Sequence, residues 1–346
     1  MRWTQPNKQQ RRTLLRTLAT LLESGLTLTD SLTVLGRSQA GEFATLIQPF
    51  ATALQRGAPL AEAAERAKWP LTQGQRLALD TAERSGRLGE VLQLLADSDE
   101  RLGQIVQKAW GAARYPMIIG GLSLLIMIGL LLGIVPQFEA LYGRFQAELP
   151  AATQSLLTLS RALNQWGGQL IALALVTCVA SGLVYSRSTS LRFIWHRTMN
   201  RLPVIGTVRL QLAGLAFSEG MQLYLAAGLA LPEALRYTAV LIENPPIQAQ
   251  LDALARGIDQ GRSDRRDLDR VLLPDDTIHL WQLGLDAGGL PRYLKMNSRH
   301  LESQLDQRLT HLTSLLEPLL MAMLGLLVGG FMLALYQPMF TMGALS

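Results

Sequence analysis

The chain has 346 residues, of which 49% are hydrophobic and 17% are charged, and its formal net charge is +5. Charged residues make up about a quarter of an ordinary soluble domain, so this composition is shifted toward a membrane environment and excludes a disordered chain. The single cysteine, Cys178, excludes a disulfide framework and a cysteine-built metal cage, and the four histidines are scattered. The composition therefore argues against a soluble enzyme.

The first element expected is an amphipathic helix near the N-terminus. Its apolar face carries Leu14, Leu15, Leu18, Leu21 and Leu22. The basic start resembles a signal peptide, but Arg16 interrupts the apolar run and no small-residue cleavage site follows. We interpret this segment as the first helix of a packed domain, with a helix lying on the anionic leaflet as the alternative.

Further apolar residues recur with helical spacing, and Gly, Pro and Asn-Pro separate the segments. Alternation typical of strands is not convincing anywhere. The pattern predicts helices over residues 42–56, 59–67, 72–84, 88–113, 212–226, 231–241, 246–260, 276–286 and 290–315. The fold class expected is all-α, with two helical-bundle domains.

Three stretches carry no charge at all: residues 117–137, 164–186 and 318–346. A helix needs about 20 apolar residues to cross the hydrocarbon layer. We therefore expect transmembrane helices at 117–137, 167–186 and 317–338. Gly167, Gly168 and Gln169 dilute the start of the second one.

The basic residues indicate the orientation. Residues 1–116 hold 15 Lys and Arg, residues 187–316 hold another 15, and residues 139–166 hold only two. Basic residues stay on the cytoplasmic side of a membrane. The helical domains 1–116 and 187–316 are therefore expected in the cytoplasm, with a loop at 138–166 and a tail at 339–346 on the far side.

Five short landmarks recur in order at an offset of 202–204 residues. The first members of the five pairs are Leu22 to Leu26, Gln55 to Gly57, Ala82 to Leu88, Arg114 to Pro116 and Pro136 to Phe138. Glycine after a leucine-rich helix suits a C-cap with positive φ, and proline suits the first turn of a span. The pattern predicts a tandem duplication, in which each unit is a helical domain followed by one outward span. Two such units require one return crossing.

These segments resemble the GspF/PilC family, the polytopic inner-membrane platform proteins of type II secretion and type IV pilus assembly, and within it the HofC-type branch. The resemblance covers about residues 13–344. It rests on the duplication and on Glu83-Arg84-Ser85-Gly86-Arg87-Leu88, Arg114-Tyr115-Pro116, Val135-Pro136-Gln137-Phe138, Leu149-Pro150, Leu316-Glu317-Pro318-Leu319-Leu320 and Leu335-Tyr336-Gln337-Pro338-Met339-Phe340.

The resemblance implies a role without catalysis and without a cofactor, in the bacterial inner membrane, with the N-terminus in the cytoplasm and the loop 138–166 in the periplasm. It implies that the cytoplasmic domains contact a hexameric secretion ATPase whose action lifts pilin or pseudopilin subunits from the bilayer. Other inner-membrane assembly proteins and further copies of the chain are the remaining partners implied. The sequence contains no G-x-x-x-x-G-K-[ST] phosphate loop, so nucleotide energy must come from a partner.

The sequence departs from the family in two places. Longer members carry an extra N-terminal segment, whereas the first repeat here begins almost at Met1. The second repeat has Asp286-Ala287-Gly288-Gly289 where members show a glutamate with Ser-Gly, and it carries a charge-dense loop from Arg262 to Arg270. The mixed signs in this loop favour a solvated segment over nucleic-acid binding.

Glu83 and Asp286 occupy equivalent places before the glycine turns at Gly86 and at Gly288 with Gly289. Each acid either binds a metal ion or a partner's arginine, or accepts a hydrogen bond from nearby backbone at a helix end. Calcium takes six to eight oxygen ligands, whereas Asp80, Glu83 and Glu90 supply at most three nearby carboxylates.

Near the membrane boundary, Arg114 is expected to anchor to headgroups. Glu317, next to Pro318, is either an interfacial acid favoured by the helix dipole or a contact that couples domain motion to the last span. Two pairs of glycines, Gly129 with Gly133 and Gly325 with Gly329, match the small-x-x-x-small packing pattern or reflect the ordinary tolerance of spans for glycine.

Two other classes of membrane protein were weighed. A transporter needs polar groups near mid-membrane, yet Cys178, Tyr185 and Tyr336 are the only ionisable side chains in the three uncharged stretches. An intramembrane enzyme needs paired catalytic groups at that depth, and the spans hold none. An orphan membrane scaffold, with no active filament, remains the alternative to the platform.

Overall fold

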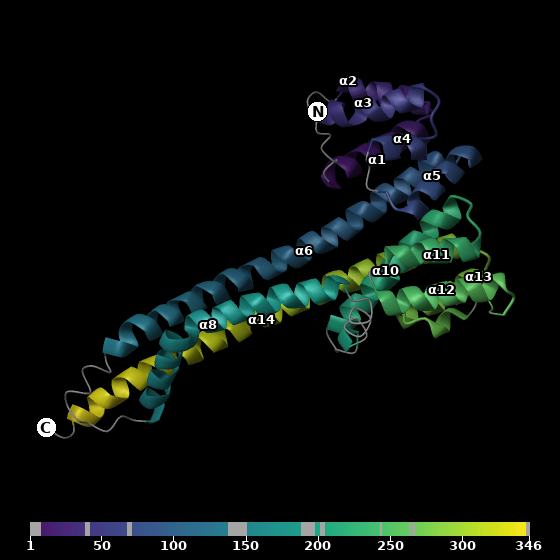
Figure 1. Cartoon of the computed structure of the whole chain (residues 1–346). Helices are drawn as coiled ribbons and strands as arrows, with labels where there is room; N and C mark the ends of the chain where they lie inside the picture. Colours follow the sequence, from purple (N-terminus) through teal and green to yellow (C-terminus); the bar gives the residue numbers. More distant parts are fainter. Residues whose placement is uncertain are drawn as a thin grey trace. The chain divides into compact units, whose positions relative to one another are not determined.

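The computed structural model describes residues 8–38, 42–67, 71–137, 151–187, 198–200, 205–242, 244–262, 264 and 267–343. Within these ranges the chain is helical and contains no strand, which confirms the all-α fold class (Figure 1). The helices are α1 Lys8–Glu23, α2 Leu28–Ser38, α3 Glu42–Gln55, α4 Leu60–Arg66, α5 Gln73–Ser85, α6 Leu88–Gly129, α8 Ala151–Arg187, α10 Ile205–Ala226, α11 Leu231–Leu241, α12 Pro245–Asp259, α13 Asp275–Asp286 and α14 Leu290–Gly343. Leu130–Ile134 is a π-helical segment and Asp267–Arg270 a 3₁₀ turn.

The chain forms two compact units. The bundle unit comprises Met1–Val106 with Arg192–Asp306, and the span unit comprises Gln107–Leu191 with Gln307–Ser346. The boundaries fall inside α6 and α14, so each of these helices contributes residues to both units. The two helical domains expected from the sequence therefore belong to one compact unit.

One apolar core runs through the bundle unit. Leu18, Leu79 and Leu92 belong to the same buried cluster as Phe217 and Trp281. The last two rings lie 5.5 Å apart, centroid to centroid, and are tilted by 55°, a geometry that aromatic pairs favour. The core thus joins segments on both sides of residues 107–191.

Local capping explains where two of the helices begin. The Thr72 hydroxyl accepts a hydrogen bond from Gln75 N, and the Gln75 side chain accepts one from Thr72 N, which is a capping box at the start of α5. At α2, Asp30 N donates to Thr27 Oγ1 at 3.2 Å. Helix α2 is absent from the helices expected on sequence grounds, although its counterpart α11 is among them.

The glycine landmarks have the backbone conformation expected of them. Among the described residues, glycines with positive φ occur at Gly25 and Gly228, at Gly57 and Gly261, and at Gly86 and Gly288. These three pairs are separated by 203, 204 and 202 residues. Each member follows a helix, where only glycine adopts the left-handed region without strain.

The prolines before the first and last expected spans do not lie in the first turn of a helix, where they were expected. Pro116 lies inside α6, and Pro318 lies inside α14, so neither one begins a helix. A proline removes one backbone hydrogen bond, and the surrounding turns of these long helices are retained on both sides. The predicted ends at residues 113 and 315 are therefore wrong.

Two helical stretches of the described chain are apolar and long enough to cross a membrane, Arg114–Gln137 and Leu290–Leu333, where three were expected. The second expected span, 167–186, is helical within α8, but most of its side chains lie outside the described residues. Helix α8 begins at Ala151, so the second half of the expected loop 138–166 is helical. Residues 138–150 and 344–346 lie outside the described chain.

The span unit has a small core of its own, formed by Leu131, Val135, Leu157 and Phe331. Beside it, Ser160 of α8 donates its hydroxyl hydrogen bond to the carbonyl oxygen of Leu131 at 2.6 Å. Leu131 belongs to the π-helical segment, whose altered backbone hydrogen bonding leaves carbonyl oxygens open to such partners. This bond ties α8 to the end of the first span.

Candidate functional site

Glu83 lies on α5 and reaches the start of the neighbouring helix α4. Its Oε2 accepts a hydrogen bond from the backbone N of Leu60 at 2.9 Å. Pro59, the residue preceding α4, provides no side-chain cap. Glu83 therefore satisfies one of the free N–H groups at this helix start, which is the backbone role weighed for it from the sequence.

A cavity of about 540 Å³ lies next to this contact and is lined by Leu28, Thr29, Leu54, Gly57, Ala58, Pro59, Asp80, Glu83 and Arg84. Arg84 pairs with Asp80 at 2.9 Å. The described residues contain no group of three His, Cys, Asp or Glu side chains suited to a metal ion. The binding of calcium by Asp80, Glu83 and Glu90 stays an untested hypothesis.

The glycine turns differ between the repeats. Gly86 caps α5 with φ 73°, and Arg87 N closes the turn by donating to Ala82 O at 2.9 Å. Gly288 has φ 70°, and Gly289 N donates to Gly284 O at 3.1 Å. Asp286 is exposed at the last residue of α13, while Glu83 is half-buried. The two acids thus share a place in the sequence but have different surroundings.

The candidates at the expected membrane boundary lie on helix surfaces. Arg114, Glu317 and Pro318 are all exposed. Trp110 and Tyr115, beside Arg114, are 64% and 53% exposed, as expected of aromatic side chains at a bilayer surface. The structure leaves the proposed roles of these residues as predictions.

The paired glycines have open surroundings among the described residues. A Cβ atom placed on Gly129, Gly133, Gly325 or Gly329 would meet none of the described atoms within 4 Å. Their role in helix packing stays a prediction.

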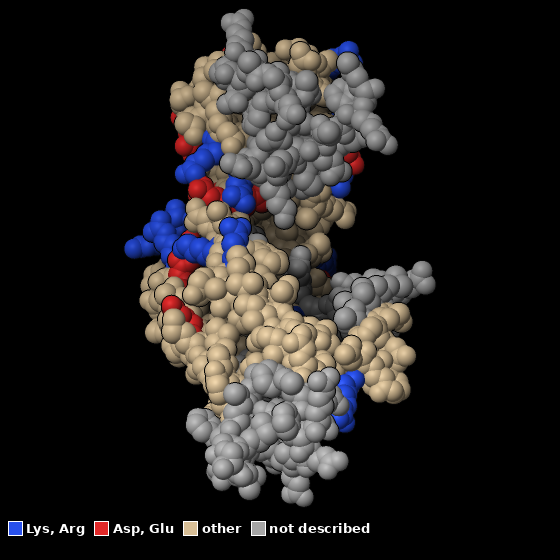
Figure 2. Space-filling model, turned by 90° about the vertical axis from the view of Figure 1, so that its left-hand side faces the viewer, with Lys and Arg blue, Asp and Glu red and all other residues tan. Residues whose placement is uncertain are grey.

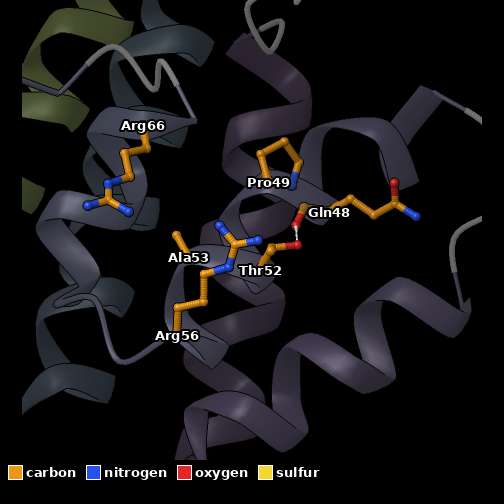
Figure 3. Close-up of a pocket in the computed structure, with 6 residues that line it drawn as sticks. All are labelled: Gln48, Pro49, Thr52, Ala53, Arg56 and Arg66. Atoms are coloured by element: carbon orange, nitrogen blue, oxygen red, sulfur yellow. Dashed lines mark hydrogen bonds between the residues drawn. The ribbon is translucent and has the colours of Figure 1, made fainter.

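A second cavity, of about 330 Å³, lies between α3 and α4 (Figure 3). Arg56, just after α3, and Arg66 of α4 line it with Gln48, Pro49, Thr52 and Ala53. Arg66 also pairs with Glu62 at 2.5 Å, and Thr52 Oγ1 donates to Gln48 O at 2.7 Å. Both arginines are exposed, so this hollow offers positive charge at the surface.

The bundles meet where α5 packs on α10 and α11. Gly74 is buried there: a Cβ on it would lie 2.7 Å from the Tyr224 hydroxyl and 2.7 Å from the Tyr237 Cβ. The two tyrosine rings are 5.9 Å apart. Burial raises the pKa of Tyr224 to about 12, and the neighbouring Tyr237 acts in the same direction, whereas Thr72 lowers it. Close approach of the two bundles thus depends on the missing side chain of residue 74.

A second part of this junction is charged. Glu219 of α10 is 8% exposed, and the Ser98 hydroxyl of α6 donates to its Oε2 at 2.7 Å. Arg101 Nη1 lies 3.7 Å from Glu219 Oε1, and Arg101 Nε lies 4.0 Å from Glu302 Oε2. Burial raises the pKa of Glu219 to about 7, against the opposing effects of Ser98 and Arg101.

Polar side chains also connect α10, α13 and α14 in the interior. Asn297 Nδ2 donates to Ser218 Oγ at 2.7 Å and to Thr277 Oγ1 at 3.0 Å. Gln222 Nε2 donates to Ser298 Oγ at 3.0 Å. Buried polar groups that pair in this way fix one relative position of the helices. The α10–α14 contact is therefore specified by hydrogen bonds as well as by apolar packing.

The charge pattern differs across the surface. Figure 2 shows, among the residues it describes, areas where Lys and Arg lie among Asp and Glu and other areas that carry few charged side chains. The apolar residues exposed along the long helices include Leu125 at 68%, Leu326 at 77% and Leu333 at 73%. Such continuous apolar exposure is typical of a surface that faces lipid.

Sequence reasoning missed Glu219 and Arg101. The offset of 202–204 residues between the two repeats was the signal that could have found this site. Glu219 lies 203 residues after Arg16, and Glu302 lies 202 residues after Glu100. In the first bundle Arg16 and Glu100 form an ion pair. In the second bundle both positions are acidic, and Arg101 of the first bundle lies beside both acids.

Comparison with known proteins gives a consistent result. The model of the family described as "Type II secretion system (T2SS), protein F" matches the chain twice, over residues 14–136 and 217–338. The type 4 fimbrial assembly protein PilC of Pseudomonas putida is 33% identical over 337 residues, covering 95% of this chain and 83% of that protein. A HofC homolog of Haemophilus influenzae is 27% identical (98% and 86% covered), and type II secretion system protein F of Pseudomonas aeruginosa is 27% identical (95% and 82% covered).

Proposed function

This chain belongs to the family of type II secretion system protein F, and from that premise we propose that it is the inner-membrane platform on which a type IV pilus or a type II secretion filament is assembled. The observation that carries this proposal is the alignment of nearly the whole chain with PilC and with protein F. The relatives named for pilus assembly and those named for secretion are similarly distant, so the platform role is common to both.

The platform acts mechanically in this proposal and catalyses no reaction. A cytoplasmic secretion ATPase supplies the energy, and pilin or pseudopilin subunits are the cargo lifted from the bilayer. The shared apolar core supports the transmission of movement from one bundle to the other. Helices α6 and α14 then carry that movement toward the membrane, because each contributes to both units.

The topology proposed has the N-terminus in the cytoplasm and three crossings of the inner membrane. Two apolar helical stretches support the outward spans. The two family matches and the three glycine pairs support a tandem duplication. Two units inserted in the same orientation need a return crossing, and the second half of α8 is an uncharged helix of sufficient length for it.

The contact and coupling residues proposed are those at the glycine turns and at the membrane boundary: Glu83, Gly86, Asp286, Gly288, Gly289, Arg114, Glu317 and Pro318. A second copy of the chain is proposed to pack on Gly129, Gly133, Gly325 and Gly329, around which the described part of the chain leaves open space. Other inner-membrane assembly proteins complete the set of partners.

The test is a pull-down of the detergent-solubilised protein against the membranes and cytosol of its own cell, read by mass spectrometry. Recovery of a secretion-type ATPase with pilin-like subunits is expected. Recovery of neither, with the protein intact and folded, would instead indicate an orphan scaffold.

Variants locate the contact. Glu83→Ala, Asp286→Ala and Gly86→Val are expected to lower filament yield while membrane insertion is unchanged. Glu83→Gln is the matched control, because its amide oxygen can still accept from Leu60 N. Wild-type filament yield from the first three variants would remove these residues from the proposal.

A further inference from the structure

Glu219 is a buried acid whose two oxygens have different surroundings. Oε2 accepts the hydrogen bond from Ser98, whereas Oε1 is buried with no hydrogen-bond partner among the described residues. The 3.7 Å separation from Arg101 is too long for a hydrogen bond, so that contact is purely coulombic. A buried carboxylate left in this state is costly in its charged form.

The surroundings contain charges of both signs. Asp97 and Arg101 face Glu219 from α6, and Lys295 and Glu302 face it from α14. A cavity of about 20 Å³ adjoins the carboxylate and is lined by Leu94, Asp97, Ser98, Arg101, Glu219, Gln222 and Lys295. The acids Asp97 and Glu302 oppose a charged Glu219, and Arg101 favours it. Desolvation is the largest effect, so the neutral form is the one this packing favours.

The positions in the first bundle that correspond to Glu219 and Glu302 hold a base and an acid. Arg16 and Glu100 form an ion pair in which both side chains are more than one-third exposed. Such an exposed pair contributes little to stability. At the corresponding place in the second bundle both residues are acidic, and Arg101 of the first bundle lies beside both of them.

We propose that Glu219, with Ser98 and Arg101 as positioning residues, forms a proton-linked clasp between the two bundles: the closed junction holds Glu219 protonated, and opening of the junction releases that proton to water. This inference goes beyond the assembly function and does not depend on it. The proton is accounted for: opening of the junction converts one buried carboxylic acid into one solvated carboxylate and one proton in water.

The size of the effect follows from linkage. The pKa of Glu219 is about 7 in the closed junction, against an ordinary value of 4.5 in water. Raising the pH from 5 to 8.5 should therefore shift the closed-to-open ratio toward the open state by roughly 10²-fold. Ser98 and Arg101 lie on α6 and Glu302 on α14, so the clasp joins the two helices that also contribute to the span unit.

The test uses the full chain in lipid nanodiscs with Cys178 replaced by serine. Spin labels are attached at Val34→Cys and Ala249→Cys, two exposed positions on α2 and α12. Double electron–electron resonance is recorded from pH 5 to pH 8.5. We expect one distance at pH 5 and a second population that grows as the pH rises toward 7 and levels off above it. A distance distribution that is unchanged over this range would overturn the proposal.

Glu219→Gln keeps the volume and an acceptor for Ser98, and it should abolish the pH dependence. All histidines remain in this variant, so retention of the wild-type titration would assign the effect to them and overturn the proposal. Arg101→Gln removes the favourable cation, so the second population should continue to grow to higher pH than in the wild type before it levels off. A titration of Arg101→Gln that levels off at the same pH as the wild type would also contradict the clasp. Glu100→Gln, in the exposed counterpart pair, is the matched control and should titrate as the wild type does.

Discussion

Glu83 illustrates how one side chain can serve a neighbouring helix. It lies at the end of α5, yet its carboxylate accepts from the first N–H of α4, where Pro59 offers no cap. The acid therefore has a structural role whatever it contacts in a larger assembly. The structural role and a role in partner contact can be separated only if the effect of a substitution on stability is measured by itself.

Glu83→Ala should lower the free energy of unfolding by about 1 kcal/mol, the ordinary cost of a lost helix cap. Glu83→Gln should retain most of the stability because an acceptor oxygen remains. Thermal unfolding of both variants in detergent measures the difference. Equal midpoints for wild type and Glu83→Ala would show that the bond to Leu60 N contributes nothing.

Gly74→Ala should weaken the junction of the two bundles. The added methyl group would lie 2.7 Å from atoms of both Tyr224 and Tyr237, so the helices must move apart. Overpacking of this kind costs about 1–3 kcal/mol. Gly111→Ala is the control, since its Cβ would meet nothing and alanine favours a helix. If Gly74→Ala unfolded at the same temperature as Gly111→Ala, the close approach of α5 to Tyr224 and Tyr237 would be contradicted.

Helices α2, α6 and α14 differ from what their sequences indicate on their own. Helix α2 is rich in Thr and Ser and has few buried leucines, so its own pattern is a poor predictor. Its counterpart α11 is predictable, and the 203-residue offset leads from one to the other. Conversely, Pro116 and Pro318 suggest helix starts, but apolar and helix-favouring residues on both sides keep α6 and α14 continuous.

Ser160→Ala should destabilise the contact between α8 and the π-helical segment by about 1 kcal/mol, because the buried carbonyl of Leu131 loses its side-chain partner. Thr158→Ala is the control: its exposed hydroxyl bonds only to carbonyls of its own helix. Unfolding in detergent should separate the two variants. Identical stability would mean that the Leu131 carbonyl finds an equal partner elsewhere.

The proposed return crossing can be tested by labelling from outside the cell. In a background without Cys178, a cysteine at Gln154 should react with a membrane-impermeant maleimide on intact spheroplasts, and one at Thr198 should not. Lysis should make Thr198→Cys reactive, which confirms that the position is accessible. The same labelling at both positions before lysis would place both ends of α8 on one side of the membrane.

Across the bundle unit, Glu219 links stability to pH. Its native pKa of about 7 lies above the ordinary 4.5, so the native state binds the proton more tightly than the unfolded chain. The contribution is therefore complete below pH 4.5 and is lost as the pH rises through 7. Relative to Glu219→Gln, the wild type should lose roughly 3 kcal/mol over this range. Denaturation at several pH values measures it, and a constant difference between the two proteins would contradict the raised pKa.

The sequence allowed prediction of what is local and failed where distant segments meet. Helices α3–α5 and α10–α13 and the glycine caps at Gly25, Gly86 and Gly228 follow from spacing and backbone preference alone. Glu219 and Ser98 are 121 residues apart, so no local pattern reveals their hydrogen bond. The shared core is likewise hidden, because leucine patterns indicate a buried face but not the segment that covers it.

That shared core also sets an order of events during synthesis. Residues 14–96 emerge first, but the segments that complete their core begin at residue 213, after the first apolar stretch and α8 have been made. At about 5–20 residues per second, the ribosome needs roughly 6 to 25 seconds to cover this gap. During that interval the face of α5 around Gly74 waits for Tyr224 and Tyr237 while the nascent chain enters the membrane. Folding of the first bundle is thus completed only after insertion has begun.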